Sequence, residues 1–337
     1  MFLKKWILYV IAFLWCFVAT AQDVHYSQQY ANRLYLNPAF AGLNHDWSVS
    51  ISHRTQWPAL NGAFLTNQVA ADLLLPNTKS AISLLLLQDK AGIGGLQKLA
   101  ASAGYAYHTP LTDRIALSAG LQATVASLSI NFDNLVFGDQ LSDNGQVAVT
   151  TAEANTFEPT QYISFATGAL LYTNQLWLGL TAAHLNKPAY GFGEKTSLPM
   201  RFTVNTGYKF YVSSYQTNGG EAEFSITPTA TFTHQKNFNW LSAGLYTNYT
   251  PVSLGLLYKG VPVTGDQNQE QALAVIAGLQ LNQVKVGFSH DVGISDFSRQ
   301  SGGATEISIV FERLGTDKVF RSRSRSKISR RIICPEI

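Results

Sequence analysis

Apolar and polar residues alternate over many short stretches of this chain. In the segment 284–291, the apolar residues Val284, Val286 and Phe288 alternate with small or polar residues. A period of two places alternate side chains on opposite faces of a β-strand. The same pattern recurs in four further segments: 47–54, 115–125, 224–233 and 306–312. The chain is therefore predicted to be all-β, with strands that have one apolar face.

Fourteen such strands can be placed along the chain. Their predicted starts are Trp47, Thr66, Ser80, Gln97, Arg114, Tyr162, Leu176, Met200, Glu223, Asn239, Val252, Gln271, Val284 and Ala304. A length near ten residues matches a tilted crossing of the hydrocarbon layer, and single-chain bacterial barrels have an even number of strands. The pattern thus favours a membrane barrel, although a soluble β-sandwich array would also alternate.

The connections between these strands alternate in length. Tight turns are predicted at 76–79, 110–113, 174–175, 250–251 and 282–283. Longer loops are predicted at 57–65, 89–95, 131–161, 186–199, 260–270 and 292–303, with exceptions at 237–238 and 212–220. Outer-membrane barrels have short periplasmic turns and long external loops. This regularity predicts that both termini lie in the periplasm.

Composition separates the barrel from the soluble sandwich. Charged residues make up only 13% of the chain, against about a quarter in ordinary soluble domains. The polar faces of the predicted strands carry mostly Ser, Thr, Gly, Ala, Asn and Gln, whereas a water-facing surface would carry more charge. We therefore predict a fourteen-stranded antiparallel outer-membrane β-barrel, spanning 46–312.

The first 21 residues have the pattern of a secretory signal peptide. Lys4 and Lys5 precede an apolar run at 6–18, and a small-residue cleavage site follows at 19–21; an N-terminal membrane anchor is the alternative. The segment 22–45 contains Asn37-Pro38 and does not alternate. We expect it to be an ordered segment at or in the barrel mouth, with a flexible leader as the alternative.

The C-terminal segment 313–337 differs in charge from the barrel. From 318 to 337 there are seven Lys or Arg and one Glu, whereas 22–316 holds fifteen Lys or Arg against nineteen Asp or Glu. Once Cys16 is removed with the signal peptide, Cys334 has no internal partner. A basic run with an apolar end predicts a periplasmic tail that binds a partner; a solvated tail or a lipid-headgroup contact is the alternative. The predicted partner-binding residues are Arg321, Arg323, Arg325, Arg330, Arg331, Ile332, Ile333, Cys334 and Pro335.

Sequence motifs typical of phosphate binding, metal binding or catalysis are weak in this chain. The Gly-rich stretch 91–95 opens no helix, the histidines lack metal-ligand spacing, and His290 faces away from Ser289 and Asp291 on a strand. We expect no enzyme activity, no cofactor, no metal and no nucleic acid. The longest loop is acidic, and we expect it to face outside and contact cargo through Asp133, Asp139, Asp143, Glu153 and Glu158.

Several motifs follow one another along the chain. They are the opening AQDVHYSQQYANRLYLNPAFAGL, then RTQWPAL, DKAGIGGLQ, HLNKP, SLPMRFTVNTGYKF, SHDVGISDFS, GGATEISIVF and the closing RRIICPEI. Together they resemble the PorP/SprF family of outer-membrane proteins of the Bacteroidota type IX secretion system. The residues that carry the first two motifs are Asn37, Pro38, Gly42, Arg54, Gln56, Trp57 and Pro58. The resemblance covers nearly all of the mature chain, though His25, Arg33 and Ile337 depart from it.

The resemblance implies a non-enzymatic role in type IX secretion or gliding motility at the outer membrane. Its implied partners are a secreted surface protein with a type IX C-terminal sorting domain and, on the periplasmic side, a peptidoglycan-binding lipoprotein or a secretion or gliding ring component. A diffusion channel or small-ligand transporter remains the alternative function, because the small polar residues of the inward faces fit a filled lumen without excluding a pore.

Overall fold

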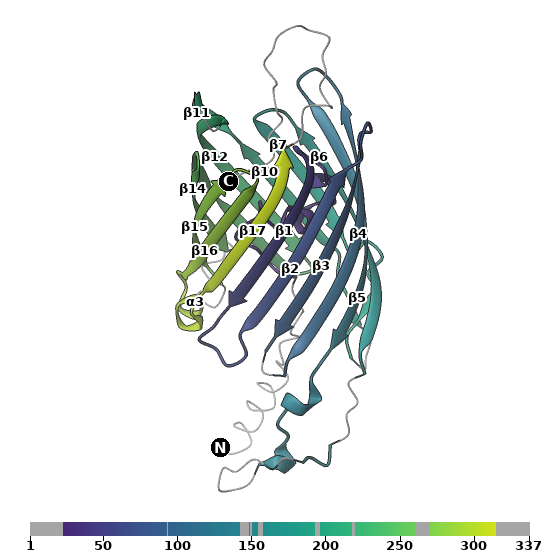
Figure 1. The fold of residues 1–337 in the computed structure, drawn as a ribbon. Coiled ribbons are helices and arrows are strands. Elements are labelled where there is room, and N and C mark those ends of the chain that lie inside the picture. Colours follow the sequence, from purple (N-terminus) through teal and green to yellow (C-terminus); the bar gives the residue numbers. More distant parts are fainter. Residues whose placement is uncertain are drawn as a thin grey trace, which may run out of the picture.

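A computed structural model describes residues 23–92, 94–141, 148, 150–153, 158–192, 196–217, 220–260 and 270–314. Within these residues, fourteen antiparallel crossings form a closed barrel, in which β1 pairs with both β2 and β17 (Figure 1). The strands are β1 (His45–Gln56), β2 (Phe64–Leu74), β3 (Ser80–Ala91), β4 (Leu96–Pro110), β5 (Ala116–Ser129), β6 (Thr160–Tyr172), β7 (Leu176–Ala183), β10 (Arg201–Tyr208), β11 (Phe210–Thr217), β12 (Gly220–Gln235), β13 (Phe238–Tyr249), β14 (Val252–Gly260), β15 (Ala272–Leu281), β16 (Val284–Gly293) and β17 (Ala304–Leu314).

One crossing of the wall is made of two parts. β10 pairs with both β7 and β12, whereas the only described pairing of β11 is with β12. The change occurs at Lys209, whose backbone nitrogen donates to the carbonyl of Gln175 at 2.8 Å. Beyond this point β11 and the start of β12 form a hairpin above the neighbouring turns (Figure 1). The predicted connection 212–220 lies in this hairpin. It was the one long connection predicted at the end of the barrel where the other turns are tight.

The predicted fold is confirmed, and each predicted strand start lies within three residues of the observed one. Alternation is the physical reason. In β1, Trp47 and Ile51 face outward with 36% and 45% of their surface exposed, whereas Ser48 and Ser52 face the lumen at 3% and 2%. A strand that separates lipid from a packed interior needs this period of two.

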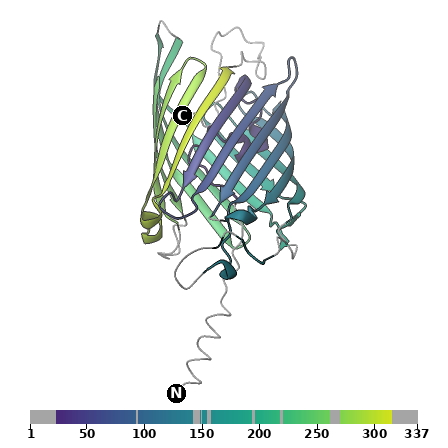
Figure 2. The same ribbon diagram turned by 60° about the horizontal axis from the view of Figure 1, so that its bottom comes forward.

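The two ends of the barrel differ. One end, at the bottom of Figure 1, carries the longer connections with η2 (Phe132–Asn134), η3 (Gly138–Gln140) and α3 (Asp296–Ser301); Figure 2 brings it forward. The hairpin of β8 (Ala189–Tyr190) and β9 (Thr196–Ser197) follows β7 at the same end. We call this the long-loop end, and the opposite end the short-turn end.

Two aromatic residues near strand ends lie on opposite faces of the wall. Tyr107 faces outward with 45% of its surface exposed, as a membrane-interface aromatic does. Trp177 is only 1% exposed and packs inside the wall, where a Cβ added to Gly207 would lie 2.0 Å from its ring. Alternation, and not proximity to a strand end, determines which aromatic side chains reach the lipid. In the described part of the chain, no helix has the length and apolar character to cross a membrane.

Candidate functional site

The N-terminal segment lies inside the barrel. Residues 23–44, which we call the plug, include the short helices α2 (Arg33–Leu36) and η1 (Pro38–Phe40). Ala39 and Phe40 have no exposed surface, and the inward-facing Ser118 of β5 donates its hydroxyl hydrogen bond to the carbonyl of Ala39 at 2.7 Å. The plug packs against the inner faces of several strands and therefore occupies the lumen.

Asn37 turns the plug and joins it to the wall. Its side-chain oxygen accepts from the backbone nitrogen of Ala39 at 2.9 Å, and Pro38 occupies the first position of η1. Its amide nitrogen donates to the carbonyls of Ala169 and Leu180, both at 3.2 Å. These bonds satisfy polar groups that would be costly to bury unpaired.

Two glycines of the wall make room for this turn. A Cβ at Gly168 would lie 1.9 Å from the side-chain oxygen of Asn37, and a Cβ at Gly120 would lie 2.5 Å from the backbone nitrogen of Ala39. Real Cβ contacts are never this short, so any side chain at either position would displace the plug.

The plug begins in a charged cluster at the long-loop end. Asp23 forms ion pairs with Lys98 at 3.1 Å, His184 at 2.8 Å and Arg201 at 3.2 Å. Burial alone would raise the pKa of Asp23, but Lys98, Arg201 and His184 outweigh burial and hold that pKa well below its usual 3.8. The three partners lie at or next to strand ends that adjoin long connections, which fixes Asp23 at the long-loop end.

A second cluster holds the plug backbone where the barrel closes. Glu306 of β17 accepts hydrogen bonds from the backbone nitrogens of Ser27 at 2.9 Å and Gln28 at 3.3 Å, and from the side chain of Asn32 at 2.9 Å. Glu306 has no exposed surface. An ionised acceptor shared by three donors is among the stronger contacts available in a protein interior.

The wall supplies the counter-charges of this second cluster. Arg54 donates to Asp291 at 3.0 Å and to Glu306 at 3.4 Å. Lys259 donates to Asp291 at 2.8 Å and to the hydroxyl of Ser27 at 2.7 Å. Two cations and two carboxylates balance each other, as buried charges require, and β1, β14, β16 and β17 are joined around the plug.

A third cluster holds the plug at the short-turn end. The backbone nitrogen of Gly42 donates to Asp72 at 2.6 Å, and Asp72 also contacts His45 and, at 3.5 Å, Arg33. Arg33 lies 3.8 Å from Glu312, which also pairs with Lys285 at 2.7 Å. The plug therefore crosses the lumen from Asp23 at one end to Gly42 at the other.

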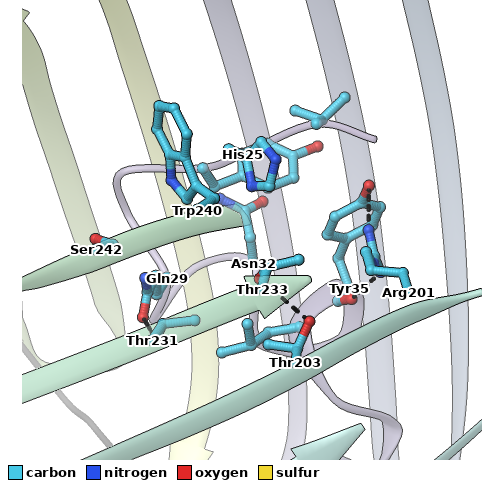
Figure 3. A pocket seen from close by; sticks show the side chains of 13 residues that line it. His25, Gln29, Asn32, Tyr35, Arg201, Thr203, Thr231, Thr233, Trp240 and Ser242 are labelled. Carbon is cyan, nitrogen blue, oxygen red and sulfur yellow. Dashed lines mark hydrogen bonds between the residues drawn. The ribbon is translucent and has the colours of Figure 1, made fainter. Parts of the chain in front are cut away.

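A small cavity beside the plug has a volume of about 40 Å³ (Figure 3). His25 stacks on Trp240 at 4.9 Å between ring centroids, and the guanidinium of Arg201 lies 4.7 Å above the ring of Tyr35. Burial, followed by the nearby cations Arg201, Lys259 and Arg54, lowers the pKa of His25 from 6.5 to about 3, although Asp23 acts in the opposite direction. His25 is therefore uncharged at neutral pH.

A larger cavity of about 160 Å³ lies beside the start of the plug at the long-loop end. Its lining includes Gln56, Trp57 and Glu270. Gln56 donates to Glu270 at 3.2 Å, and Trp57 packs edge-on against Phe64 at 5.0 Å between centroids. Burial raises the pKa of Glu270 above its usual 4.5. The cavity combines aromatic faces with charged groups, a lining suited to polar ligands that also bear apolar groups.

The two ends of the described chain lie at opposite ends of the barrel, and the expectation that both termini face the periplasm stays a prediction. The first described residue, Asp23, lies at the long-loop end, whereas the last strand, β17, runs to the short-turn end at Leu314 (Figure 1). The described chain thus starts and finishes at opposite ends, because the plug adds one further crossing through the lumen. The expected signal peptide lies outside the described residues.

The predicted family-motif residues converge on the plug and the larger cavity. Asn37, Pro38 and Gly42 belong to the plug itself, and Arg54 holds its backbone through the second cluster. Gln56 and Trp57 line the larger cavity, and Pro58 is exposed beside them. Part of the motif therefore forms or holds the plug, and the other part lies at the larger cavity.

The predicted acidic loop residues behave as surface groups. Asp133, Asp139, Glu153 and Glu158 are all exposed. Asp139 accepts from the hydroxyl of Thr151 at 2.9 Å and from the backbone nitrogen of Ala152 at 2.6 Å, which lowers its pKa below 3.8. Asp143 lies outside the described residues. So do the tail positions Arg321, Arg323, Arg325, Arg330, Arg331, Ile332, Ile333, Cys334 and Pro335.

Sequence reasoning missed most residues that hold the plug. They are Asp23, Arg33, His45, Asp72, Lys98, Arg201, Lys259, Lys285, Asp291, Glu306 and Glu312. A signal was present, because most of them are charged residues on lumen-facing positions of strands that otherwise carry little charge. No group of three or more His, Cys, Asp or Glu that could hold a metal occurs among the residues that the structure describes.

Comparisons with known proteins match one family model and several solved structures. The family model described as type IX secretion system membrane protein PorP/SprF matches residues 18–311. No curated protein matches the chain. Solved structures similar in fold include Omp33 from Acinetobacter baumannii, at 10% identity over 80% of this chain and 99% of that one, with a TM-score of 0.45. The toluene transporter TbuX from Ralstonia pickettii has 10% identity over 84% of this chain and 93% of that one, with a TM-score of 0.44. The monoaromatic hydrocarbon channel CymD has 12% identity over 87% of this chain and 92% of that one, with a TM-score of 0.45.

Proposed function

Because the chain belongs to the PorP/SprF family of type IX secretion system membrane proteins, we propose that it is a non-enzymatic outer-membrane component that anchors surface cargo, or assists its export, and links it to a periplasmic partner. The cargo class is a secreted surface protein with a type IX C-terminal sorting domain. The periplasmic class is a peptidoglycan-binding lipoprotein or a component of the secretion or gliding ring.

The filled lumen carries this proposal. The plug crosses the barrel from end to end, and three charge clusters hold it. Releasing it would leave several buried charges unpaired, which costs about 3–5 kcal/mol for each broken pair. A barrel closed in this way is a poor conduit, so its rims are the surfaces available for binding proteins. A diffusion channel or small-ligand transporter is correspondingly less well supported.

The long-loop end is proposed to face the cell surface and to bind cargo. The acidic loop supports this, since Asp133, Asp139, Glu153 and Glu158 are exposed there. The larger cavity opens at the same end. An epitope inserted near Asn144 should be accessible to antibody on intact cells, and deletion of 132–158, which removes all of the acidic residues named for this loop, should lower the amount of surface-retained cargo.

A carboxylate at the opposite end of the barrel provides the control for cargo binding. Asp113 is an exposed carboxylate in the β4–β5 turn at the short-turn end, and its replacement by Asn should leave cargo retention unchanged. Unchanged retention after the loop deletion would refute the cargo role of the loop. An inaccessible epitope would refute the orientation.

The short-turn end is proposed to face the periplasm. β17 ends there, so the segment after Leu314 starts at this rim. That segment contains the basic run at 318–331, which suits an acidic partner surface, while its apolar end suits a pocket. We propose that the tail at 313–337 is the link to the periplasmic partner.

A further inference from the structure

The outer wall of the barrel has a groove over β2 to β6. Its volume is about 480 Å³ and its lining is almost wholly apolar, within the range of about 300–1,000 Å³ typical of small-ligand sites. The groove lies on the lipid-facing surface, away from the plug and from the larger cavity. It is therefore independent of the contacts discussed above.

A single small residue creates the groove. Val69, Leu86, Ala101 and Val125 are register partners across four neighbouring strands and form one outward-facing row. Leu86 and Val125 have 57% and 56% of their surface exposed and flank Ala101 on either side. Ala101 cannot fill the space between these larger side chains, so the row has a gap.

The row next to it, toward the long-loop end, is mostly polar. Asn67, Gln88, Ser127 and Gln161 line the groove at this end, and Leu99, between Gln88 and Ser127, is the apolar member of the row. Asn67 donates to Gln88 at 3.2 Å, and His53 contacts Asn67 at 2.7 Å, so a hydrogen-bonded ladder crosses β1, β2 and β3 on the outer face. Polar side chains on a lipid-facing wall belong at the level of the headgroups.

We infer that this groove binds one acyl chain of a lipid from the leaflet at the long-loop end. The apolar groove matches the chain, and the His53–Asn67–Gln88 ladder matches the polar group to which the chain is attached. This pairing of an apolar groove with a polar end specifies an amphiphile and its orientation. A second copy of the protein would instead need a broad complementary surface.

The test is lipid retention by the intact protein. The protein is extracted from outer membranes, exchanged extensively into lipid-free non-ionic detergent and weighed by native mass spectrometry. Wild type should retain one lipid, whose mass identifies it as glycolipid or phospholipid. Ala101→Phe, which fills the gap, should lower the retained fraction at least fivefold.

Ala277→Phe is the matched control. Ala277 is also an exposed, outward-facing alanine, between Leu254 and Phe288 on the opposite part of the wall, and the groove does not involve it. It should retain lipid as wild type does. Equal retention by both variants, or no lipid on wild type, overturns the inference. A protein dimer that Ala101→Phe dissociates overturns it as well, because the occupant is then a second copy.

Discussion

The backbone nitrogen of Ser27 donates to the carboxylate of Glu306 at 2.9 Å, across 279 residues of chain. Ser27 belongs to the plug and Glu306 to β17, the strand that pairs with β1 to close the barrel. The contact therefore couples the contents of the lumen to the integrity of the wall.

Glu306→Ala should destabilise the folded barrel. The change removes the acceptor for Ser27 and leaves Arg54 with one carboxylate partner instead of two. Breaking a buried pair costs about 3–5 kcal/mol. The denaturant midpoint of the folded band on unheated gels should fall accordingly. Asp296→Ala breaks an exposed pair with Arg299 at 3.8 Å, which should give no measurable shift; equal shifts would contradict the role of Glu306.

Gly120→Val should open the lumen. Its side chain would meet the backbone of Pro38 and Ala39 at about 2.5 Å, so the plug has to move while β5 keeps its pairing. Wild type should show no steady conductance in planar bilayers, and Gly120→Val should show discrete channels. Ala123→Val, on the exposed outer face of the same strand, is the control. Conductance in wild type would favour the channel alternative.

Acidification should loosen the plug through His25. Its pKa is about 3 when docked, against 6.5 when free, so the released plug binds more protons between these values and docking weakens as pH falls. Above about pH 6.5 the equilibrium constant for docking does not depend on this group. Below about pH 6.5 that constant falls by up to roughly tenfold for each pH unit. Protease protection of the plug should therefore drop between pH 7 and 5, where Asp23 stays ionised.

His25→Phe tests that assignment. The phenyl ring can keep the stacking on Trp240 but does not titrate. Protection should then be nearly flat between pH 7 and 5. The same decline in both proteins would show that another group is responsible.

Truncation after Gly315 should separate insertion from partner binding. β17 ends at Leu314, so the barrel should still reach the outer membrane and migrate as folded protein. Co-purification of the periplasmic lipoprotein or ring component should be lost. Neutralising Arg321, Arg323 and Arg325 should only weaken it, and the difference from wild type should shrink at high salt, where the attraction of these charges is screened. Wild-type recovery of the partner by the truncated protein would assign the docking site to another part of the short-turn end.

Much of the wall could be predicted because its pattern is local. A membrane strand needs a period of two, and residues such as Ile51 and Ser52 carry that pattern within a few positions. Tight turns such as 250–251 and 282–283 add a second local signal. Position near a strand end is a weaker signal than alternation, because Trp177 lies near a strand end and is nevertheless buried.

The interior could not be predicted in the same way because its contacts are not local. The pair Asn37-Pro38 predicts a turn. The neighbouring sequence does not indicate that the side chain of Asn37 bonds to the carbonyls of Ala169 and Leu180. The inward positions of Asp291 and Glu306 follow from alternation. Their pairing with Arg54 depends on barrel closure, which brings together strands from the two ends of the chain.

The route of the plug also constrains how the molecule can assemble. Asp23 lies at the far rim from His45, where the plug joins β1, so a late insertion would have to thread the whole segment through the lumen of a barrel that has already closed. Closure of loops this long is slow, and contacts between distant residues delay folding. We therefore expect the plug and the β1–β17 junction to gain protection simultaneously during refolding, as a single cooperative step in which the barrel wraps around the segment that was synthesised before it.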